Sequence, residues 1–231
     1  MGRFIDALKR ERITWSQFFF QLVIVLLGVY LAIFFERKAQ ERSLAEDTAA
    51  MLQNVVTELE QDDAEIQRIL GIVNNKKEIA LEMVGLLARA SQEDAPVLDS
   101  LMQAYMDNNR TAFVRKGAYT SMVSGGYLRS LARTELPARF AALYERTYTR
   151  VIVAGDLQDF NYAEVLAPAY TELMDMQNGR FIRPGPEANV HLRNELLRIV
   201  WGVDFYITFL ERTLVEVREV KGLVEAYLEG N

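Results

Sequence analysis

The chain opens with a long apolar run. From Phe18 to Phe35 the sequence holds 18 residues, of which Gln21 is the only strongly polar one. A helix of this length covers about 27 Å, which is close to the hydrocarbon thickness of a bilayer. Trp15 lies just before the run, where amphipathic rings favour the membrane interface. The pattern predicts a transmembrane helix over residues 17–36.

A cleaved signal peptide is the alternative for this run. Its apolar core has about 7–15 residues and is followed by small residues at the cleavage site. Here the run is longer and ends in the bulky sequence IFFERK. We therefore expect an uncleaved anchor.

The charges that flank the run predict its orientation. Residues 1–16 have a net charge of +2 (4 − 2), from Arg3, Lys9, Arg10 and Arg12 against Asp6 and Glu11. Basic residues stay on the cytoplasmic side, and long domains translocate whatever their charge. The prediction is a cytoplasmic segment over 1–16 and an extracytoplasmic, periplasmic domain over 37–231, in a bacterial inner membrane.

One face of the predicted membrane helix combines polar and small residues. On a helical wheel Gln17, Gln21, Ile24, Gly28 and Ala32 fall within about 80° of one another. A small-xxx-small pair lets a second helix approach closely, and glutamine can hydrogen-bond across the contact. We expect this face to bind another membrane subunit. The alternative is a lipid-facing helix in which these residues have no special role.

Beyond the membrane run, apolar residues recur at spacings of three and four, which is typical of an amphipathic helix. They are Leu44, Thr48, Met51, Val55, Leu59, Ile66, Leu70 and Val73. Gly71 and Asn74-Asn75 are residues that can interrupt the helix before a second periodic stretch over 79–87.

Shorter helices are expected over 96–106, 117–123 and 127–132, and a longer one over 134–176 with a break at Pro168. A Gly/Pro-rich loop at 178–189 precedes a final helix over 190–228. The predicted fold class is all-α, with one N-terminal transmembrane helix continuing into an antiparallel helical bundle.

Composition excludes several kinds of chemistry. The 231 residues include no cysteine and one histidine, His191, so disulfides, thiolate nucleophiles and multi-histidine metal sites are excluded. We expect His191 to be a surface or capping residue; the alternative is a metal ligand. The net charge is −6, and the part after the membrane run sums to −8 (−6 − 2). This charge argues against nucleic-acid binding.

The sequence has none of the GxSxG, GxxxxGK[ST] or HExxH motifs of hydrolases and nucleotide-binding proteins. Ser124-Gly125-Gly126 predicts a tight turn rather than a phosphate-binding loop. The acidic run at Glu60, Asp62 and Asp63 lacks the spacing of a calcium loop and predicts a solvated helix face. We therefore expect neither an enzyme nor a cofactor.

Two further groups are candidate contact residues. Seven tyrosines lie between residues 105 and 170, where they form either an interface or a core: Tyr105, Tyr119, Tyr127, Tyr144, Tyr148, Tyr162 and Tyr170. Arg180, Phe181, Ile182 and Arg183 form a basic and aromatic loop that could contact an acidic partner or lipid headgroups.

Two segments carry a resemblance to a known family. They are QLVIVLLGVYLAIFFERKAQER, Gln21 to Arg42, and AYTSMVSGGYLRSLARTELPARFAALYERTY, Ala118 to Tyr148. They resemble uncharacterised bacterial single-pass membrane proteins that share a domain of unknown function. The resemblance implies an anchored helical architecture and no particular activity.

These features predict a non-catalytic accessory subunit of a larger membrane complex, for example a respiratory or photosynthetic one. Its expected partners are the lipid bilayer and other membrane subunits. The alternative is an extracytoplasmic helical domain that senses a ligand and acts through a partner.

Overall fold

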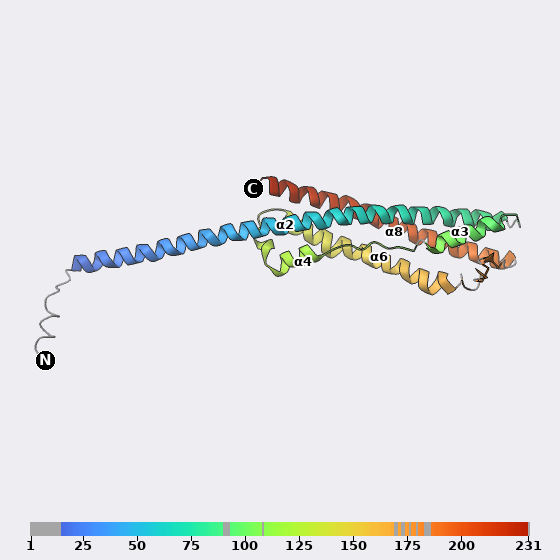
Figure 1. The fold of residues 1–231 in the computed structure, drawn as a ribbon, viewed down its shortest axis with the longest axis horizontal. Coiled ribbons are helices and arrows are strands. Elements are labelled where there is room, and N and C mark those ends of the chain that lie inside the picture. Colours follow the sequence, from blue (N-terminus) through green and yellow to red (C-terminus); the bar gives the residue numbers. More distant parts are fainter. Residues whose placement is uncertain are drawn as a thin grey trace, which may run out of the picture. The chain divides into compact units, whose positions relative to one another are not determined.

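A computed structural model describes residues 15–89, 93–107, 109–168, 171, 174–175, 177–178, 180–182 and 186–230. The α-helices are α2 (Trp15–Arg89), α3 (Ala95–Asp107), α4 (Gly117–Ser124), α5 (Leu136–Phe140), α6 (Tyr148–Asn161) and α8 (Pro186–Glu229) (Figure 1). Between them lie the 3-10 helix η1 (Tyr127–Arg129) and the π-helices η2 (Ala141–Thr147) and η3 (Tyr162–Leu166). Two short strands, β1 (Met174–Asp175) and β2 (Arg180–Phe181), pair antiparallel. The predicted all-α fold class is confirmed.

The predicted interruption of the first long helix does not occur, because α2 continues without a break through Gly71 and Asn74 to Arg89. The Asn74 amide donates to the carbonyl of Leu70, one turn back. Val73, Lys76, Ile79, Ala80 and Met83 are buried on the other face of the helix. Packing of the buried face thus outweighs the low helix propensity of glycine and asparagine.

The chain divides into two compact units, Met1–Thr48 and Ala49–Asn231. In the first unit every side chain from Phe19 to Asp47 is exposed, and burial along α2 begins at Thr48. The apolar window in this part of α2 is long enough and apolar enough to cross a membrane.

The second unit, here called the bundle, has α2, α6 and α8 as its long members (Figure 1). Lys77 pairs with Asp204, and Lys221 pairs with Glu60, so α2 and α8 are antiparallel. Tyr148 and Asp159 of α6 lie beside the early and later parts of α2 in the bundle, so these two helices run in the same direction. The core between them contains, among others, Leu52, Leu59, Ile66, Met83, Phe140, Tyr148, Val151, Leu196, Leu210 and Val217.

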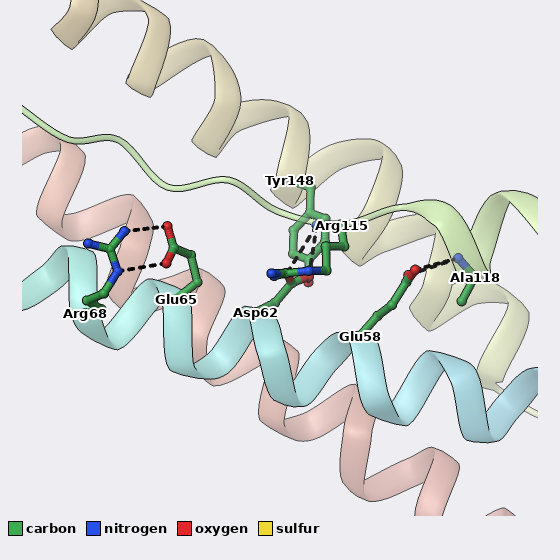
Figure 2. A network of polar contacts seen from close by, with 7 residues as sticks. All are labelled: Glu58, Asp62, Glu65, Arg68, Arg115, Ala118 and Tyr148. Atoms are coloured by element: carbon green, nitrogen blue, oxygen red, sulfur yellow. Dashed lines mark hydrogen bonds and ion pairs between the residues drawn. The ribbon is translucent and has the colours of Figure 1, made fainter.

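Between α3 and α4 the chain is extended. Residues 109–116 form neither helix nor strand and lie along α2 (Figure 2). The sequence predicted no element between the helices over 96–106 and 117–123. Further along, helical structure continues to Pro168, and the π-helix η3 ends two residues before that proline. The expected break at residues 166–167 is thus replaced by a widened helical turn.

Candidate functional site

Three carboxylates lie on one face of α2: Asp62 bonds to the extended segment, Glu58 bonds to the start of α4, and Glu65 pairs with Arg68 of α2 itself (Figure 2). Glu58, Asp62 and Glu65 follow one another at spacings of four and three, which places them on one side of the helix. Glu58 accepts the backbone N–H of Ala118 at 2.9 Å. This bond satisfies a free N–H in the first turn of α4, and the negative charge is favourable at that helix end.

Asp62 is the central carboxylate and is 0% exposed. It accepts the backbone N–H of Arg115 at 3.1 Å, the Arg115 guanidinium at 3.0 Å and the Tyr148 hydroxyl at 2.7 Å. Burial raises the pKa of Asp62, and the bonds from Tyr148 and Arg115 oppose that rise. With its oxygens occupied by these donors, Asp62 has a structural role.

The prediction of a solvated acidic face was therefore wrong at Asp62. The other two acidic residues of the run lie at the edge of the bundle instead. Asp63 pairs with Arg218, and Glu60 pairs with Lys221 at 2.9 Å. Adjacent residues of a helix point about 100° apart, so one acidic run supplies both a buried anchor and two surface ion pairs.

Lys76 is a second buried polar group that the sequence did not single out. It is 6% exposed, and its Nζ donates to Asn109 Oδ1 at 2.9 Å. The same amine lies 4.8 Å from the ring centre of Tyr105. Asn109 in turn donates to Asp159 at 3.1 Å. Burial lowers the pKa of Lys76 to about 8, and the charge of Asp159 opposes that shift. This chain of contacts fixes the start of the extended segment between α2 and α6.

The tyrosines that were predicted to form an interface or a core mostly belong to the core. Tyr119 stacks on Tyr144 with ring centres 4.4 Å apart, and Tyr144 meets Tyr148 edge to face at 5.2 Å. Tyr105, Tyr144 and Tyr148 are fully buried. Within the described part of the chain, the hydroxyls of Tyr105 and Tyr144 have no hydrogen-bond partner. Tyr170 lies outside the described residues.

The predicted membrane interface falls in the exposed part of α2. Gln21, Gly28 and Ala32 are exposed, while the side chain of Gln17 lies outside the described residues. A Cβ added at Gly28 meets nothing within 4 Å. The fold of this chain therefore does not require glycine at position 28.

The predicted basic and aromatic loop is only partly described. Arg180, a residue of β2, and Ile182, which follows that strand, are exposed. Arg183 and the side chain of Phe181 lie outside the described residues. His191 is an exposed residue of α8, and no group of three or more potential metal ligands occurs among the residues that the structure describes.

A surface that the sequence did not predict lies between α6 and α8. We call it the α6–α8 groove, a hollow of about 280 Å³ lined by Thr149, Arg150, Val153, Ala154, Leu157, Phe205 and Phe209. Phe160 of α6 and Trp201 of α8 follow on the same two helix faces. Trp201 is 75% exposed and Phe205 57% exposed. Large apolar side chains that gather on one surface mark a binding site more often than single exposed ones do.

One end of the α6–α8 groove is cationic. Arg150 and Phe209 also line an adjoining hollow of about 150 Å³, together with Arg146, Arg212, Glu216 and two threonines. Glu216 accepts the hydroxyl of Thr147 at 2.5 Å. None of the three arginines forms an ion pair with a carboxylate in the described part of the chain. The α6–α8 groove thus has an apolar surface that lies next to three arginines without an ion-pair partner among the described residues.

A sequence signal for this surface existed. Along α8, Val203, Tyr206 and Leu210 form an apolar stripe at spacings of three and four, and all three are buried. Trp201 and Phe205 are large aromatic residues that fall outside this stripe. Apolar residues away from the core-facing stripe of an amphipathic helix are candidates for a second interface.

Comparison with known proteins identifies the family. The model of the family described as "Family of unknown function (DUF6090)" matches residues 21–174, which are 154 of the 231 residues (174 − 21 + 1). The match includes both segments on which the resemblance rested. Searches of curated proteins and of solved structures gave no match. The chain belongs to DUF6090, a family of unknown function.

Proposed function

We propose that this chain is a non-catalytic, single-pass membrane protein that acts as an accessory subunit of a larger membrane complex. The observation that carries the proposal is the α6–α8 groove, whose exposed aromatic and aliphatic side chains have no cover within the described chain. Most of the other large apolar residues of the bundle pack into one core, and others, such as Phe113 and Val215, are exposed elsewhere on its surface. A bundle that gathers several large exposed apolar side chains in one groove beside its core fits a subunit with a docking partner.

The polar residues support a structural role. The buried acid and the buried amine, Asp62 and Lys76, hold the extended segment through contacts within the chain. A general acid or base needs a position from which it reaches a substrate. Both groups are instead covered and bonded, which favours a protein whose task is binding.

In this proposal residues 17–36 cross the bilayer, residues 1–16 are cytoplasmic and residues 37–231 are periplasmic. The apolar window near the N-terminus and the basic residues before it support this topology. Gln21, Gly28 and Ala32 supply the contact with a neighbouring membrane helix, because small residues permit close approach and glutamine can bond across it.

Purification in mild detergent tests the proposal. The tagged wild-type chain should elute with other membrane subunits, which mass spectrometry then identifies. Gly28→Leu and Gln21→Leu should reduce their recovery without changing the helical circular dichroism of the chain. Val23→Phe adds bulk on the opposite side of the helix and serves as the control. A wild-type chain that migrates alone as a monomer contradicts the proposal.

A further inference from the structure

The three long helices of the bundle form three surface grooves, and polar contacts within the chain cross two of them. The hollow that remains between α2 and α8, of about 350 Å³, is lined almost entirely by charged residues. The extended segment and α4 cover the groove between α2 and α6 (Figure 2). Ion pairs bridge the groove between α2 and α8, including Lys77 with Asp204 at 2.6 Å. Between α6 and α8 the Thr147–Glu216 bond marks one end, and the apolar stretch beyond it is open.

We propose that the α6–α8 groove binds an amphipathic helix of a partner protein, with an acidic turn of that helix against Arg146, Arg150 and Arg212. The inference rests on the proposed function and deepens it, because it states the chemistry of the partner.

The walls of the groove determine which type of occupant fits. Both walls are α-helices, whose backbone N–H and C=O groups are bonded within each helix. They therefore offer no strand edge to which an extended peptide could add. Val153, Leu157 and Phe160 stand at spacings of four and three along α6, and Trp201 and Phe205 stand four apart along α8. The exposed side chains of these two rows can pack between the side chains of a third helix.

The same rows argue against an acyl chain as the occupant. A lipid tail needs an enclosed channel that removes it from water, whereas Trp201 and Val153 are 75% and 61% exposed. Phe205 is supported edge to face by Phe209, with ring centres 4.6 Å apart. Tryptophan and arginine, which both occur at this groove, are among the residue types that contribute most of the binding energy at protein interfaces.

The positive charge at one end of the α6–α8 groove determines which end of the partner helix carries acidic residues. The hollow at the end of the groove contains three arginines and one glutamate, a net charge of +2 (3 − 1). Glu216 is already engaged by Thr147. Among the described residues these guanidinium groups form no ion pair, so carboxylates on the partner can pair with them, and arginine forms such pairs with two parallel hydrogen bonds.

The length of the groove sets the size of the partner helix. Ten residues separate Arg150 from Phe160 along α6, which corresponds to about 15 Å. About three helical turns with apolar residues on one face span this distance. An acidic residue pair belongs in the turn at the Arg150 end, and the opposite end packs on Phe160 and Trp201.

Site-specific photo-crosslinking in the cells that express the chain tests this inference. A photoreactive phenylalanine analogue replaces Phe205 in the groove, and the same analogue at Thr57, an exposed position of α2, is the control. The full chain is then purified and the crosslinked peptide is mapped. We expect an adduct from position 205 only, mapped to an amphipathic helical segment of another protein that has acidic residues at one end.

Charge reversal then tests the orientation. Arg150→Glu should lower the yield of the adduct about tenfold, as expected for the loss of a favourable pair and its replacement by repulsion. Arg129→Glu, at an exposed site on η1, should leave the yield unchanged. Reversal of the mapped partner acid to lysine should restore the adduct with the Arg150→Glu chain.

The other outcomes overturn the inference. They are an adduct with a second copy of this chain, with lipid, or with a segment that lacks acidic residues, and also the absence of any adduct from position 205. If a partner copurifies through the anchor and position 205 gives no adduct, the groove inference fails while the proposed function stands. If the wild-type chain also migrates alone in mild detergent, both fail.

Discussion

The hydroxyl of Tyr148 donates a hydrogen bond of 2.7 Å to a carboxylate oxygen of Asp62, and both side chains are fully buried. The two residues are 86 positions apart. Their bond connects α6 to the face of α2 that also holds the extended segment. Four residues before Tyr148, Tyr144 is equally buried but its hydroxyl has no partner in the described chain. The two tyrosines therefore form a natural pair for comparison.

Tyr148→Phe should destabilise the bundle by about 2 kcal/mol, because it removes one donor from a buried carboxylate. Tyr144→Phe should be neutral or stabilising, since it removes a hydroxyl that was desolvated without gaining a bond. Thermal unfolding of the full chain in detergent micelles, followed by circular dichroism, measures both. Equal destabilisation by the two variants would contradict the assigned role of the Tyr148 hydroxyl.

The stability of the bundle should rise with pH above neutrality because of Lys76. The pKa of this amine is lowered from 10.5 to about 8 in the folded state, so between these values the unfolded chain binds more protons than the folded chain. Folding then becomes more favourable as pH increases, by about 1.5 kcal/mol between pH 8 and pH 9.5. Unfolding measured across this range should show the rise in the wild type.

Lys76→Met is the control for that pH dependence. Methionine keeps much of the apolar stem and has no proton to exchange, so the rise between pH 8 and pH 9.5 should disappear. Lys77→Met, at the half-exposed neighbour that pairs with Asp204, should retain it. A rise that persists in Lys76→Met would assign the effect to another group.

Adjacent residues of α8 should respond differently to substitution. Phe205→Ser should change the free energy of unfolding by less than about 0.5 kcal/mol, because the ring stands on the surface of the α6–α8 groove. Tyr206→Phe should cost about 1–3 kcal/mol, because the Tyr206 hydroxyl accepts the backbone N–H of Ala112 at 2.7 Å. Chemical denaturation of the full chain compares them. A large loss with Phe205→Ser would mean that the groove wall belongs to the core.

Two glycines should have opposite effects when replaced by alanine. Gly126, after α4, has φ of 74°, so Gly126→Ala should destabilise by about 1 kcal/mol. Gly71 lies inside α2, and a Cβ there meets nothing within 4 Å. Gly71→Ala should stabilise by about 0.5–1 kcal/mol through higher helix propensity. The same sign for both variants in thermal unfolding would contradict the assigned backbone conformations.

The periodic part of the sequence predicted most of the fold. Val55, Leu59, Ile66 and Val73 repeat at helical spacing and are all buried in α2. Ser124-Gly125-Gly126 was expected to be a tight turn, and Gly126 adopts the left-handed conformation there. These features depend on local spacing and backbone conformation, which the sequence specifies directly.

The predictions that failed depended on contacts between distant residues. Nothing local distinguishes Asp62 from Asp63, yet Arg115 and Tyr148 cover only the first. The continuity of α2 through Asn74 likewise depends on burial against other helices. The α6–α8 groove was missed because α6 and α8 had to be placed side by side before Val153 and Phe205 could be joined into one surface.

The order of elements along the chain has a consequence for biosynthesis. The buried stripe of α2 is complete once Arg89 has been made, but α8, which covers it, ends 140 residues later at Glu229 (229 − 89). At ordinary translation rates this interval lasts on the order of ten seconds. Until then Leu59, Ile66 and Met83 lack the part of their core that α8 supplies, so the nascent chain exposes apolar surface that is prone to aggregation unless it is shielded.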